Sequence, residues 1–94
     1  MGTLYQRVTS DQLVSRTPIW IYSLVITSNG TAEADATIYD GESTSGDAVL
    51  TLYTVDESMA QLVFPEPLYL HKGLYVDIGS NVTEVLVQYV TRRE

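Results

Sequence analysis

The feature that most constrains this 94-residue chain is its series of short runs rich in β-branched and aromatic residues. Segments such as IWIYSLVIT, LTLYTV and VTEVLVQYV favour strands, while the clusters SNG and DGESTSGD between them favour turns. No window has the apolar spacing and the capping residues of a helix of ten residues or more. The segment SDQLVSR, residues 10–16, is expected to form at most a single turn. The sequence therefore predicts an all-β protein.

Strands are expected at eight places in a single domain that covers residues 1–94. Their approximate ranges are 3–9, 18–28, 32–40, 48–55, 59–64, 67–71, 73–78 and 82–91. About eight short antiparallel strands, with turns at close intervals, predict one compact β-sandwich, either jelly-roll or immunoglobulin-like. Residues 1–10 are expected to form an N-terminal arm or an edge strand. The two prolines of FPEPLYL place that segment at a sheet edge or at a crossover between sheets.

The strands expected at 18–28 and 82–91 are apolar on both faces. A regular strand at 18–28 would carry Trp20, Tyr22, Leu24 and Ile26 on one face, and Ile19, Ile21 and Val25 on the other. Because a two-layer sandwich has one interior, the second apolar face is either covered by loops or buried against another subunit. The second interpretation predicts a homo-oligomer, with interface residues Leu4, Tyr5, Ile19, Ile21 and Val25.

Composition limits the kinds of partner. Twelve acids against five bases give a formal net charge of −7, and such a surface repels the phosphates of nucleic acids. The chain has no cysteine, which excludes disulfides and thiolate metal sites. Its longest apolar run is too short for a membrane-spanning helix, and its N-terminus lacks the pattern of a signal peptide. We therefore expect no nucleic-acid partner, no membrane partner and no export through a cleaved leader.

The acidic segment DGESTSGD, residues 40–47, is the first candidate for a chemical site. An irregular calcium site would use Asp40, Glu42 and Asp47, but the segment does not fit the EF-hand pattern, and a polar turn explains the same residues. The single histidine, His71, lies at a strand junction, and no serine lies in a nucleophile-elbow sequence. The sequence predicts no catalytic, metal-binding or cofactor-binding residue and therefore no enzyme. Convergence of Asp40, Glu42 and His71 in one pocket would favour an enzyme instead.

Tyrosine is unusually frequent, with seven residues spread over most of the predicted strands. Exposed tyrosines suit protein interfaces or stacking against sugars, whereas half-buried ones are ordinary strand residues. The composition therefore leaves open an alternative function, that of a carbohydrate-binding module or an adhesin-type β-sandwich.

Three short elements together resemble small all-β virion proteins of tailed bacteriophages, including head-decoration and accessory structural proteins. They are the turn YDG at 39–41, the element KGL at 72–74 and a last strand that contains Tyr89. The resemblance covers most of the chain and implies a non-enzymatic β-sandwich, located in the virion after assembly in the host cytoplasm. The implied partners are capsid or other virion proteins, commonly bound as an oligomer. No functional residue is transferred, because the matching positions are ordinary turn and strand residues.

Overall fold

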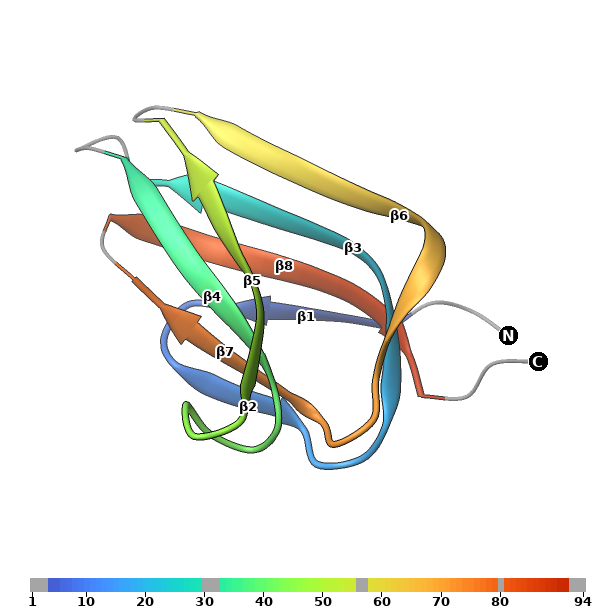
Figure 1. The fold of residues 1–94 in the computed structure, drawn as a ribbon. Helices are drawn as coiled ribbons and strands as arrows, with labels where there is room; N and C mark the ends of the chain where they lie inside the picture. The colour runs from blue at the N-terminus through green and yellow to red at the C-terminus, as the bar shows by residue number, and fades with distance from the viewer. Residues whose placement is uncertain (1–3, 30–32, 56–57, 80, 92–94) are drawn as a thin grey trace.

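The computed structural model describes residues 4–29, 33–55, 58–79 and 81–91, and the regular structure of these residues consists of strands. The strands are β1 (Leu4–Val8), β2 (Gln12–Ser15), β3 (Ile19–Ser28), β4 (Ala34–Asp40), β5 (Asp47–Thr54), β6 (Met59–Leu70), β7 (Leu74–Ile78) and β8 (Val82–Val90). They form two four-stranded antiparallel sheets, in the orders β1-β8-β3-β6 and β2-β7-β4-β5, which pack face to face (Figure 1). The prediction of an all-β sandwich is confirmed.

The strands pair in a nested order. β1 pairs with β8, β2 with β7, β3 with β6 and β4 with β5, all antiparallel. The chain is therefore arranged like one long hairpin, with its tip between β4 and β5, rolled up into two layers (Figure 1). This is the arrangement of an eight-stranded jelly roll, whereas an immunoglobulin-like sandwich has a different strand order. The strand order thus selects one of the two sandwich types that the sequence allowed.

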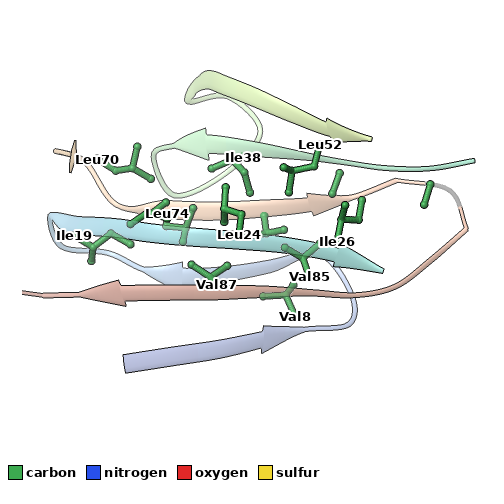
Figure 2. Packing of buried hydrophobic residues seen from close by; sticks show 14 residues of the cluster. Val8, Ile19, Leu24, Ile26, Ile38, Leu52, Leu70, Leu74, Val85 and Val87 are labelled. Atoms are coloured by element: carbon green, nitrogen blue, oxygen red, sulfur yellow. The ribbon is translucent and has the colours of Figure 1, made fainter. Parts of the chain in front are cut away.

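The core lies between the two sheets and is mainly aliphatic (Figure 2). Ala34, Ala36 and Ile38 of β4 are buried, while Asp35 and Thr37 between them are half-buried on the opposite face. Strands with this clear alternation were predicted correctly, because one face packs on the core and the other meets water.

β3 departs from regular alternation at a β-bulge. Opposite β8, the register shifts between Ile21 and Ser23, so that Tyr22 is an extra residue in β3. Ile19 and Ile21 before the bulge, like Leu24 after it, are 0% exposed and belong to the core. The prediction that Ile19 and Ile21 lie on a spare outer face and form an interface is therefore wrong.

The bulge is invisible in the sequence because IWIYSLVI is apolar at both odd and even positions. A shift of one residue exchanges the two faces of a strand, and the sequence of a strand distinguishes the two faces only where they differ in polarity. Here either alternation supplies apolar side chains to the core. The choice is consequently made by the neighbouring strands β6 and β8.

Two other segments differ from the expected strands. Residues 12–15 form β2, where only a turn was expected, because β7 supplies the backbone partners of this short strand. The ranges 59–64 and 67–71 are parts of one strand, β6, whose pairing with β3 is interrupted between Val63 and Leu68. β6 lies at an edge of its sheet, which is one of the two positions that its prolines allowed.

Candidate functional site

The acidic segment 40–47 forms the corner between β4 and β5, at the tip of the nested hairpin. Asp40 is buried, and its Oδ1 accepts a hydrogen bond from the backbone N–H of Lys72 at 2.8 Å. Its Oδ2 lies 3.1 Å from Nδ1 of His71. Through these contacts Asp40 ties the β4–β5 corner to residues 71–73, which connect β6 to β7. Its carboxylate therefore has a structural role in joining two corners of the sandwich.

The other acids of this segment pair separately. Glu42 lies 3.9 Å from Arg16, and Asp47 lies 3.5 Å from Lys72, with all four side chains largely exposed. The structure thus brings Asp40 and His71 together, while Glu42 pairs with a different residue. Within the described ranges, no group of three His, Asp or Glu side chains is placed to hold a metal ion.

Replacing Asp40 with alanine is expected to lower the free energy of unfolding by about 1–3 kcal/mol, because the backbone N–H of Lys72 loses its acceptor. Asp40→Asn is the matched control, since its amide oxygen can still accept that hydrogen bond. Its smaller cost would reflect the altered contact with Nδ1 of the exposed His71. The measurement is urea denaturation of both variants. Equal stabilities of Asp40→Ala and wild type would contradict the structural role.

The outer face of the β2-β7-β4-β5 sheet carries an acidic cluster, Asp11, Asp35 and Asp77. Asp11 Oδ1 accepts a hydrogen bond from the backbone N–H of Ile78 at 2.8 Å, which holds it beside Asp77. The pKa of Asp77 is raised above its ordinary value, and the largest cause is partial burial. The negative charge of Asp11, the hydrogen bond between the Asp11 and Asp77 side chains, and the charge of Asp35 raise it further. At neutral pH the folded state therefore holds a carboxylate that its surroundings disfavour.

Asp77→Asn is accordingly expected to stabilise the protein at pH 7, by up to about 1 kcal/mol because the site is partly solvated. A folded-state pKa above the unfolded value of about 3.9 destabilises the fold when both states are ionised. The gain should shrink as pH falls through the raised pKa and disappear below about pH 3.9, where both states are protonated. Denaturation curves at pH 7 and pH 3 measure this change. Asp47→Asn, which removes an exposed ion-pair partner, should not stabilise the protein at either pH.

The outer face of the β1-β8-β3-β6 sheet is richer in apolar residues. We call the following set the outer patch: Tyr5, Trp20, Val25, Met59, Val63, Tyr69 and Leu86. Tyr5 is 72% exposed, Met59 63% and Val63 59%, while Trp20, Val25 and Leu86 are half-buried. Val25 and Leu86 are direct cross-strand partners, and each is flanked in its strand by buried core residues. The patch therefore points away from the core.

Rings line up at one end of this face. Trp20 and Tyr69 are direct cross-strand partners, with ring centroids 4.9 Å apart and an interplanar angle of 32°. The ring centroids of Tyr69 and His71 lie 6.2 Å apart, and Nδ1 of His71 lies 3.1 Å from Oδ2 of Asp40. The three rings therefore form a short row at this end of the face.

The predicted interface residues are thus divided by the structure. Tyr5 and Val25 belong to the outer patch, whereas Leu4 is 49% exposed at the rim of the core side of β1. Their part in an interface stays a prediction. Sequence reasoning missed Met59, Val63 and Tyr69, although an apolar segment beside two prolines was a signal for an exposed edge.

Comparison with protein-family models, curated proteins and solved structures finds no match to this chain. In the ranges that the structure describes, no helix has the length and apolar character required to cross a membrane.

Proposed function

We propose that this protein is a non-enzymatic structural protein of a tailed-bacteriophage virion, which attaches to capsid or other virion proteins through its outer patch. The observation that carries the proposal is the exposure of Tyr5, Met59 and Val63 on one sheet face. Exposed large apolar side chains that gather on one face of a small domain support a protein interface at that face.

The distribution of charge supports an orientation for this contact. The outer face of the opposite sheet carries Asp11, Asp35 and Asp77, and the whole chain has a formal net charge of −7. On the patch side, Arg7 and Glu84 neutralise each other at 3.1 Å. Docking through the patch buries few unpaired charges and leaves the acidic face in solvent, where ionised groups are stable.

The jelly-roll arrangement is compatible with this role, because eight-stranded jelly rolls are found in viral capsid proteins and also in lectins. One fold serves many functions, so the fold supports the proposal by analogy alone. The residues of the outer patch distinguish the possibilities.

The test is co-sedimentation of the purified protein with empty capsids, and in parallel with purified tails, of a tailed phage that carries its gene. Wild type is expected to pellet with the capsids, and Tyr5→Lys is expected to remain in the supernatant because it places a charge in the patch. Tyr53→Lys is the matched control, since Tyr53 is 67% exposed on the other sheet. Absence of wild-type binding to capsids and tails, or equal loss with both variants, would contradict the proposal.

A carbohydrate-binding module is the second candidate, favoured by the row of rings Trp20, Tyr69 and His71. Aromatic faces stack against sugar rings, but here the Trp20 and Tyr69 rings already contact each other, with centroids 4.9 Å apart, which makes this the weaker candidate. On a glycan array, this alternative requires binding by wild type and its loss in Tyr69→Ala. Wild type that binds no glycan excludes it on the glycans presented.

A further inference from the structure

We propose that two copies of this chain associate edge to edge through β6, by antiparallel pairing of residues 59–63 about a two-fold axis at Gln61. The inference goes beyond the proposed function, because this contact requires no virion protein and would stand if the outer patch bound nothing. It starts from the position of β6, which pairs with β3 and ends the sheet on its other side (Figure 1).

The hydrogen-bond pattern shows which backbone groups face the open edge. The N–H of Ser28 donates to the carbonyl of Ser58 at 2.9 Å, and these residues continue the register in which Ile26 opposes Ala60. Opposed residues in an antiparallel pair alternate between those that exchange backbone hydrogen bonds and those that do not. Ala60 and Leu62 therefore direct their backbone groups toward β3. The backbone groups of residues 59, 61 and 63 consequently point to the open edge.

The apolar side chains at this edge are also incompletely buried. Met59 and Val63 are exposed on the outer face, and Leu62, on the core side, is still 38% exposed. This is the densest group of exposed large apolar side chains on any of the four edge strands, and residues 59–63 contain no charge, proline or glycine. Natural edge strands are usually protected by charges, prolines or bulges. At β6 such protection begins only at Pro65.

A second copy is the occupant that fits this edge. A two-fold axis at Gln61 places Met59 opposite Val63, Ala60 opposite Leu62, and Gln61 opposite its own counterpart. In this register the outward-facing backbone groups of the two copies lie opposite each other. Residue 59 of one copy pairs with 63 of the other, 61 with 61, and 63 with 59, and each of these three pairs exchanges two hydrogen bonds. The small Ala60 leaves room for Leu62 of the other copy. An isologous contact of this kind closes as a dimer.

The net charge of −7 on each copy opposes association, while the paired segment itself is neutral. Pairing over five residues gives a small interface, which belongs to the weak and concentration-dependent class. Added salt screens the repulsion between the acidic bodies and leaves the uncharged contact unaffected, so the dimer should strengthen with ionic strength.

The test is analytical ultracentrifugation of the full chain over a range of protein concentrations. Wild type is expected to show a reversible monomer–dimer equilibrium. Gln61→Lys and Gln61→Glu each place like charges face to face at the axis and should weaken the dimer about fivefold or more. An equimolar mixture of the two variants should restore association, because a Lys–Glu pair then spans the axis.

Thr44→Lys is the matched control, because it adds the same charge at the exposed β4–β5 corner, away from the contact, and should not weaken the dimer. Gln61 is exposed, and denaturation curves will show whether its variants remain folded. A wild type that stays monomeric at all concentrations overturns the proposal. It is also overturned by a dimer that Gln61→Lys does not weaken, or by a mixture that fails to restore association. None of these results involves capsids, so they are independent of the co-sedimentation test.

Discussion

Ile21→Ala is expected to lower the free energy of unfolding by about 2–5 kcal/mol, the usual cost of truncating a fully buried isoleucine. Ile21 is 0% exposed and packs in the core between the sheets. A chain of this length is stabilised by roughly 5–14 kcal/mol in total, so the loss is a large fraction of its stability. Urea denaturation monitored by circular dichroism measures the change.

Val25→Ala is the matched control for the bulge. In a regular strand Ile21 and Val25 would share a face and respond alike. The bulge at Tyr22 instead directs Ile21 to the core and Val25 to the outer patch, where truncation should cost about 1 kcal/mol or less. Leu24→Ala should resemble Ile21→Ala, because Leu24 is also fully buried. Similar costs for Ile21→Ala and Val25→Ala would contradict the bulged register.

Gly73→Ala is expected to destabilise the protein by about 3 kcal/mol or more, through two independent effects. Gly73 has a φ of 132°, a backbone conformation that residues with a side chain rarely adopt. A Cβ at this position would lie 2.4 Å from the backbone carbonyl oxygen of Ser15, at the end of β2. Because that oxygen belongs to the backbone of a paired strand, the clash cannot be relieved by rotating a side chain.

Lys72→Ala is the control for this corner. Lys72 is exposed, and its side chain contributes one surface ion pair with Asp47, so its loss should cost no more than about 1 kcal/mol. Its backbone N–H still reaches Asp40 in the variant. Thermal unfolding of both variants provides the comparison. A Gly73→Ala protein as stable as Lys72→Ala would mean that the corner accepts a side chain.

The sequence predicted only part of the candidate site. The sequence correctly indicated a polar turn at 40–47, but the contact between Asp40 and His71 joins residues far apart in the chain. Val25 was predicted to lie at the surface because the strand at 18–28 has more apolar residues than one core needs, and Tyr5 because residues 1–10 were expected to form an arm or an edge strand. Ile19 and Ile21 were assigned to that surface by an alternation that the bulge interrupts.

By itself the sequence determined the all-β character and the sandwich, and it limited the proline segment of β6 to a sheet edge or a crossover, because propensity, alternation and proline act over a few neighbouring residues. The tertiary structure decided the jelly-roll order, the pairing of β2 with β7 and the bulge at Tyr22. Those features depend on which distant strands exchange hydrogen bonds and which side chains fill one shared core. A strand with apolar residues at every position carries no local information about which face is inside.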